Sequence, residues 1–149
     1  MYKIPVIRLM VVRDSNYRAK TQKIEQPADV ALLLQQYLAG ADRENLVIVM
    51  MDTKNKVIGI HTAGIGTLNA VMYHPREIFK AAIMMNSAGI IIGHNHPSTD
   101  CTPSKEDILM TERMIEAGKI LGIPVLDSII ASDDTYYSIR EEGHLDFGF

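Results

Sequence analysis

Cysteine and long apolar runs are the scarcest features of this sequence of 149 residues. A single cysteine, Cys101, excludes an intramolecular disulfide and any zinc site built from several thiolates, and we expect it in a partly exposed loop. Apolar stretches such as residues 45–51 and 88–93 are far shorter than the roughly 18–20 residues of a membrane-spanning helix. Arg8 interrupts the apolar N-terminus, and no small-residue cleavage site follows it. We therefore expect a cytoplasmic protein without a membrane segment.

The composition is otherwise that of a globular chain, with 47% hydrophobic and 22% charged residues, and the length suits one domain over residues 1–149. Lys and Arg outnumber Asp and Glu by six to two in residues 1–25, whereas the remainder holds nine against sixteen. The net charge of −3 gives no general attraction to nucleic acid. The basic N-terminal segment is a candidate contact for DNA phosphate, and a plain solvated strand edge is the alternative.

The apolar pattern predicts strands that alternate with helices. Strands are expected over residues 4–12, 44–52, 57–69, 88–96, 123–132 and 135–140. Helices are expected over residues 27–39, 74–86 and 104–122. In the last of these, Ile108, Leu109, Met114, Ile115 and Leu121 are compatible with one apolar face toward the core. Residues 1–26 then form an N-terminal strand and a basic extension. Because two hairpins accompany the helical connections, the sequence predicts an α/β fold: a single layered domain with a mixed central β-sheet flanked by helices.

Two histidines stand where a predicted strand ends, in the stretch GHNHPSTDCTPSKED of residues 93–107. His94 and His96 are two positions apart, so in strand conformation their rings project from the same face and can reach one metal ion. Catalytic zinc commonly takes three protein ligands and leaves a fourth position to water. A third ligand is therefore required.

Asp107 is the first candidate for that ligand, because a helix that starts near Ser104 carries it in the first turn, facing back toward the strand end. Asp100 and Glu106 compete, although Glu106 points roughly 100° away from Asp107 around the helix. The same residues also have a purely structural interpretation, in which Ser104 caps the helix and Asp107 completes a capping box without any metal.

Hydrolysis also needs a group that takes a proton from the attacking water. Glu44 stands at the start of the strand over residues 44–52, where an acidic side chain precedes an apolar run. Asp42 and Glu77 are alternatives, and their spacing in the sequence does not decide between the three.

These residues resemble the JAMM metalloprotease signature, which consists of a glutamate, then His-x-His-Pro, then Ser-x-x-Asp. The matching letters here are EN at residues 44–45 and HNHPSTDCTPSKED at residues 94–107. The wider segments resemble the RadC branch of the JAB/MPN superfamily, historically labelled DNA repair proteins: MDTKNKVIG, GTLNAVMYHPREIFKAAI and GKILGIPVLDSIIAS. The resemblance covers residues 27–142.

Carried over by position, the resemblance implies one zinc ion per chain, held by His94, His96 and Asp107. It implies Glu44 as the general base and Ser104 as a hydrogen-bond donor to the oxyanion. It also implies the JAB/MPN architecture, which is like that of the cytidine deaminases. Deamination itself is excluded, because its His-x-Glu or Cys-x-Glu step and its Pro-Cys-x-x-Cys motif are both missing from the sequence.

The sequence departs from the family pattern in two places. Asn95 occupies the position between the histidines where many JAMM enzymes have Ser or Thr, as it does in RadC-type members. Fuller RadC proteins carry an N-terminal helix-hairpin-helix region, for which 149 residues leave no room. We expect a zinc-dependent hydrolase that cleaves amide or isopeptide bonds in a peptide or protein. The sequence is also compatible with a homo-oligomer. The alternative is a RadC-type DNA-repair-associated accessory or DNA-binding module with little or no catalysis.

Overall fold

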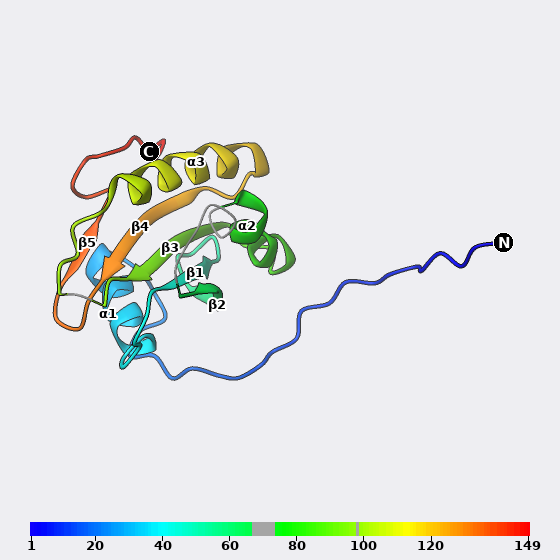
Figure 1. Cartoon of the computed structure of the whole chain (residues 1–149), viewed down its shortest axis with the longest axis horizontal. Helices are drawn as coiled ribbons and strands as arrows, with labels where there is room; N and C mark the ends of the chain where they lie inside the picture. The colour runs from blue at the N-terminus through cyan, green and yellow to red at the C-terminus, as the bar shows by residue number, and fades with distance from the viewer. Residues whose placement is uncertain (67–73, 98) are drawn as a thin grey trace.

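A computed structural model describes residues 1–66, 74–97 and 99–149 and shows one mixed sheet covered by helices (Figure 1). The strands in chain order are β1 (Asn45–Met51), β2 (Val57–Ile65), β3 (Gly89–Asn95), β4 (Val125–Ala131) and β5 (Tyr136–Ser138). Their order in the sheet is β2-β1-β3-β4-β5. β3 and β4 run parallel, and the other neighbours are antiparallel. The predicted α/β domain with a mixed sheet is confirmed.

Three helices are described: α1 (Pro27–Tyr37), α2 (Pro75–Met84) and α3 (Lys105–Leu121). The first two begin at a proline, whose fixed φ and missing N–H suit the first helical turn. The third connects parallel strands β3 and β4, as a crossover must. Helix α1 lies on one face of the sheet, and α2 and α3 lie on the other (Figure 1). Within the described residues, no helix has both the length and the apolar character to cross a bilayer.

The sheet is buried on both faces because alternate residues of its central strands enter different cores. The core toward α2 and α3 includes Leu46, Ile48, Ile90, Ile92, Phe79 and Met114. The core toward α1 includes Val47, Val49, Ile91, Leu33, Leu34 and Ile129. All residues of β1 and β3 are buried, which explains why both strands read as continuous apolar runs rather than alternating ones.

The predicted first hairpin is confirmed by the pairing of β1 with β2. Asp52 holds its turn: its Oδ1 accepts hydrogen bonds from the backbone N–H groups of Lys54, at 2.8 Å, and Lys56, at 2.9 Å. Asn55 takes a φ of 60°, a conformation that asparagine tolerates better than most residues. The predicted strand continued to residue 69, and its last residues lie outside the described part of the chain.

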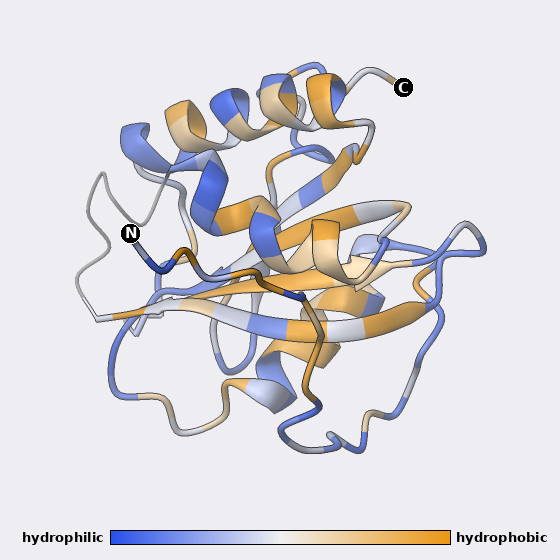
Figure 2. Cartoon of the chain, turned by 90° about the vertical axis from the view of Figure 1, so that its right-hand side faces the viewer, coloured by the Kyte–Doolittle hydropathy of each residue, from blue (hydrophilic) through white to orange (hydrophobic). Residues whose placement is uncertain are grey.

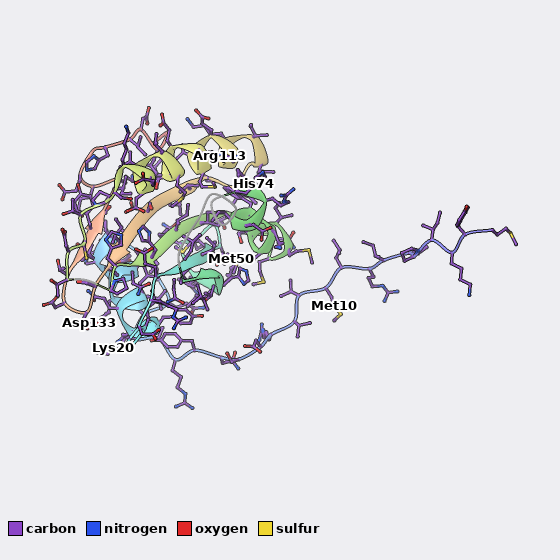
Figure 3. All side chains as sticks on the ribbon, viewed as in Figure 1. Met10, Lys20, Met50, His74, Arg113 and Asp133 are labelled. Carbon is purple, nitrogen blue, oxygen red and sulfur yellow. The ribbon has the colours of Figure 1, made fainter. Side chains whose placement is uncertain are left out.

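The strand predicted over residues 4–12 is wrong. Residues 1–19 contain no strand or helix, their side chains are exposed, and the segment leads away from the body of the protein (Figure 1). Apolar and basic residues alternate along it (Figure 2), and Met10 projects into open space (Figure 3). Its apolar and β-branched composition favours a strand, but strand formation needs a neighbouring strand to pair with. The segment joins the sheet only near Lys23, which bridges to Lys56 beside β2.

Helix α3 turns its predicted apolar face inward only in part: Met114 and Ile115 are buried and Ile108 packs against the core, as expected. Leu109 and Leu121 were expected in the core and are 55% and 44% exposed. The buried stripe contains Asp107, Met110, Thr111, Met114, Ile115 and Gly118. Polar and small residues therefore occupy three positions of the inner face, and one of them is a candidate metal ligand.

Candidate metal centre

The end of β3 brings the two histidines together. Ile90 and Ile92 face α2 and α3, and the strand alternation puts His94 on that same side. The Nε2 atoms of His94 and His96 are 3.2 Å apart. The side chain of His94 is 2% exposed and that of His96 is 15% exposed, so the pair is shielded but remains open to solvent at one end.

The first turn of α3 brings Asp107 to these rings. Its backbone N–H donates to Ser104 Oγ at 3.1 Å, and its own Oδ2 accepts from Ser104 N at 2.8 Å, which completes a capping box. The carboxylate is buried, with Oδ1 3.3 Å from His94 Nε2 and Oδ2 3.4 Å from His96 Nε2. The capping and metal-binding interpretations therefore describe one arrangement, because the cap turns the carboxylate toward the histidines.

The spacing of these donor atoms fits a tetrahedral metal ion. Bonds of about 2.0–2.1 Å from a tetrahedral centre place any two ligand atoms about 3.3–3.4 Å apart. In the site the two Nε2 atoms are 3.2 Å apart, and each lies 3.3 or 3.4 Å from a different oxygen of Asp107, so one donor atom from each residue can approach a shared ion. Two imidazole nitrogens and one carboxylate form a donor set that zinc accepts, with a fourth position left for water. Across residues 1–66, 74–97 and 99–149, this is the one cluster of His, Cys, Asp or Glu side chains with metal-binding spacing.

Backbone contacts orient the His96 ring for ligation. Its Nδ1 lies 3.0 Å from the carbonyl oxygen of Asp100, so the Nδ1–H donates to that carbonyl and the lone pair of Nε2 faces the site. The Nδ1 atom of His94 is buried and has no hydrogen-bond partner among the described residues. In both rings, Nε2 is the nitrogen that faces Asp107.

The three groups shift each other's protonation. Burial by itself raises the pKa of Asp107, but the His94 and His96 rings outweigh it and hold this pKa far below the ordinary carboxyl value. The hydrogen bond with Asp107 raises the pKa of His96, against the opposing effect of burial. Asp107 is thus an anion at any ordinary pH, whereas a proton on His96 competes with a metal ion.

The competing carboxylates for the third ligand are directed elsewhere. Asp100 Oδ1 accepts a hydrogen bond from the backbone N–H of Thr102 at 2.9 Å, although the Asp100 backbone carbonyl contacts His96. Glu106 is exposed on the outer side of α3. Cys101 in the same loop is buried, which corrects the expected partial exposure, because its Sγ packs 3.7 Å from the carbonyl of Thr135.

The three candidates for the base lie in different surroundings. Asp42 is exposed and paired with Arg43 at 3.1 Å, and Glu77 is paired with Lys80 at 3.2 Å on α2. Glu44 is half-buried directly before β1.

Strand register relates Glu44 to the metal centre. The ladder between β1 and β3 ends at the pair Leu46 and His94, so Glu44, two residues before Leu46, and His96, two residues after His94, lie at the same end of this strand pair. The charge of Glu44 contributes, as a minor cause, to the raised pKa of His96, which indicates that the two groups are near each other.

The sequence did not reveal the contacts of Asn95, which lies between the two histidines. Its Oδ1 accepts a hydrogen bond from Asn45 N at 2.7 Å, and its Nδ2 donates to the carbonyl of Arg43 at 3.0 Å. The partners are separated by 50 and 52 residues in the chain. No local pattern signals such a contact, because only the pairing of β1 with β3 brings the two segments together.

Comparison with known proteins places this chain among its relatives. The RadC-like JAB domain family matches residues 24–144. A UPF0758 protein of Caldanaerobacter subterraneus is 48% identical over 124 residues, which are 83% of this chain and 53% of that protein. UPF0758 proteins of Desulforamulus reducens and Methanosarcina mazei are 48% and 45% identical, over 80% and 82% of this chain and 53% of each relative.

The matched region begins and ends close to the limits of residues 27–142, over which the sequence resembles the RadC branch. The chain spans about half the length of the curated relatives it matches. A family match over most of the chain, together with relatives well above 30% identity, determines the family. The chain belongs to the RadC-like JAB domain family.

Proposed function

We propose that this protein is a zinc-dependent hydrolase that cleaves amide or isopeptide bonds in a peptide or protein. The observation that carries the proposal is the cluster of His94, His96 and Asp107, whose donor atoms lie within 4.8 Å of one another and form a donor set that zinc accepts. A bound zinc ion would supply acidity to a water molecule and polarise the substrate carbonyl.

Glu44 performs the proton transfer in the proposed reaction. Its carboxylate accepts a proton from the attacking water and passes it to the leaving amine as the C–N bond breaks, so that one water is consumed for each bond cleaved. Two observations support this assignment: Glu44 directly precedes the end of β1 that pairs with His94, and its charge acts on His96. Asp42 and Glu77 are less suited, since each is engaged with a neighbouring cation.

Ser104 supports the oxyanion in the same reaction. Its Oγ accepts the hydrogen bond of Asp107 N at 3.1 Å, which leaves the hydroxyl proton free to donate to a substrate oxygen. The side chain is exposed at the start of α3, where substrate can reach it. A hydrogen bond that strengthens as negative charge develops on the carbonyl oxygen lowers the barrier without tightening substrate binding equally.

A pocket of about 170 Å³ is lined in part by His96 and lies on the α1 side of the sheet, across from the face of His94, and we assign it to a substrate side chain at a distance from the scissile bond. Its walls combine apolar and polar groups, including Leu34, Leu38, Pro97 and Ser132. Such mixed lining suits a side chain of moderate size, with the polar groups fixing its orientation.

The test combines metal analysis with cleavage assays. We expect purified protein reconstituted with zinc to hold one ion per chain, and a panel of peptides and isopeptide-linked peptides to be cleaved. Glu44→Gln should keep the zinc and lose about 10²–10⁴-fold in kcat, because it removes the general base but no ligand. Glu77→Gln is the matched control and should behave as wild type. Absence of zinc after reconstitution would overturn the mechanism.

A second candidate function, a DNA-associated accessory role, is favoured by the N-terminal segment. Residues 1–20 are extended and almost wholly exposed, and Lys3, Arg8, Arg13, Arg18 and Lys20 follow one another along it. Cations on a free extended segment can neutralise DNA phosphates, and such binding weakens steeply with salt. Deleting residues 1–20 leaves the bridge at Lys23 intact. If DNA affinity and its salt dependence are unchanged by the deletion, this role for the segment is wrong.

A further inference from the structure

We propose that Asn95 is the positioning residue for Glu44, an inference that rests on the proposed hydrolase function. Asn95 lies on β3 between the two candidate histidine ligands and is 8% exposed. Its side chain is directed away from the metal centre toward the segment before β1, where it makes both of its hydrogen bonds.

The two hydrogen bonds of Asn95 hold the peptide groups on either side of Glu44. Oδ1 accepts from Asn45 N, at 2.7 Å, which belongs to the peptide group after Glu44. Nδ2 donates to Arg43 O, at 3.0 Å, which belongs to the peptide group before Glu44. Because these two groups bound the Cα of Glu44, one carboxamide restrains both backbone dihedrals of that residue.

Two further hydrogen bonds complete the restraint from other directions. The Glu44 carbonyl accepts from Gly66 N at 2.8 Å, next to the end of β2. The Asn45 side chain donates to the same Arg43 carbonyl at 2.9 Å, so both lone pairs of that oxygen are used. The backbone of Glu44 is therefore tied to the β2 side and to the β3 side of β1.

The position of Asn95 in the sheet explains why it matters for the reaction. The ladder between β1 and β3 ends at Leu46 and His94, and beyond it the Asn95 carboxamide takes the place of backbone pairing. The same strand end carries the ligands His94 and His96. One residue thus sets the base relative to the metal ligands, and an error of about 1 Å in such a placement can cost about 10²-fold in rate.

The kinetic test compares wild type with Asn95→Ala, both loaded with zinc. We expect kcat to fall by about 10–100-fold while KM and zinc affinity change less than about twofold, because the ligands and the substrate contacts remain. In the Glu44→Gln background, Asn95→Ala should cause no further loss. Ser138→Ala is the matched control on β5: it also removes two hydrogen bonds, a buried one donated to Asp127 and a part-buried one accepted from Glu141 N. It should leave kcat unchanged.

A second measurement does not depend on activity. With Co²⁺ in place of zinc, the paramagnetic shifts of the Glu44 side-chain NMR signals report the distance of its carboxylate from the metal. We expect large shifts in wild type and in Ser138→Ala and much smaller ones in Asn95→Ala. If Asn95→Ala does not fold, Asn95→Asp is used, because it keeps the shape and the acceptor but loses the donor to Arg43.

The outcomes separate this inference from the proposed function. If wild type binds metal but cleaves nothing, the hydrolase proposal fails, and the Co²⁺ measurement alone decides whether Asn95 positions Glu44. Equal Glu44 shifts in wild type and the Asn95 variant would overturn the inference. A parallel loss of zinc affinity and kcat, or additive losses with Glu44→Gln, would also overturn it, because Asn95 would then act on the ligands or on the fold.

Discussion

Replacing Asp107 by asparagine should separate its two roles, as a metal ligand and as part of the helix cap. An asparagine oxygen can still accept the hydrogen bond from Ser104 N, now 2.8 Å from Asp107 Oδ2, and the backbone N–H still donates to Ser104 Oγ. We therefore expect the free energy of unfolding of the metal-free variant to lie within about 1 kcal/mol of wild type. Its response to zinc should be very different.

The size of that difference follows from binding linkage. Free zinc at 100 times its dissociation constant stabilises the wild type by about 2.7 kcal/mol, which raises Tm by about 5–11 °C in a chain of this size. Changing a residue that only hydrogen-bonds to a metal ligand weakens metal binding by up to about 100-fold. Loss of one of the three ligands themselves should therefore weaken zinc binding by at least about 100-fold. At the same zinc concentration the variant then gains about 0.4 kcal/mol, or about 1–2 °C.

The assay is a thermal melt of each protein with and without zinc, alongside metal analysis. Glu106→Gln is the matched control, since it changes the adjacent, exposed carboxylate of the same helical turn and should keep the full zinc response. Asp107→Ala should lose the zinc response and, in addition, about 1 kcal/mol of metal-free stability from the capping box. A full zinc response in Asp107→Asn, or its loss in Glu106→Gln, would refute the assignment of the third ligand.

Three further predictions follow from other contacts. Gly118→Ala should destabilise by about 1–3 kcal/mol in denaturant unfolding despite a helix-propensity gain of about 1 kcal/mol, because its Cβ would lie 2.5 Å from the Ile123 carbonyl oxygen. Asp127→Ala should cost about 2–4 kcal/mol by the same assay, since Ser138 Oγ and two backbone N–H groups lose their acceptor. Because the pKa of His96 is raised in the folded chain, protonated His96 should stabilise the metal-free protein. This stabilisation should be complete below the pKa that His96 has in the unfolded chain and should be lost as the pH rises through the folded-state pKa. Stabilisation by zinc should instead increase with pH, because a proton on His96 competes with the metal ion. In melts from about pH 5.5 to about pH 8, a zinc-induced rise in Tm that shrinks with increasing pH would contradict this prediction.

Much of the fold was predictable because its determinants are local. The three helices begin where proline or the Ser104 cap predicted, and β1 and β3 are apolar over their whole length because both of their faces are buried. The segment at residues 4–12 shows the limit of this reasoning. Its composition favours a strand, but a strand exists only where another strand offers unpaired backbone groups, and composition does not encode that partner.

The inner face of α3 was predicted only in part, for a related reason. Hydrophobicity favoured Leu109 and Leu121 as core residues, yet Asp107, Thr111 and Gly118 lie inward. Asp107 is balanced there by two histidines, and Gly118 permits the close approach of the chain at Ile123. Polar and small residues can face inward where tertiary partners satisfy them, and a helical pattern cannot show those partners.

The sequence by itself determined the parts of the metal centre that depend on short-range geometry. The two-residue period of a strand pairs His94 with His96, and the capping box at Ser104 turns Asp107 back toward the strand end. Only the tertiary structure decided the parts that join distant segments. The antiparallel pairing of β1 with β3 brings the segment that carries Glu44 to the strand end that carries the histidines, and the Asn95 carboxamide spans the same junction. Register is a property of two strands together, so neither strand's sequence alone could specify it.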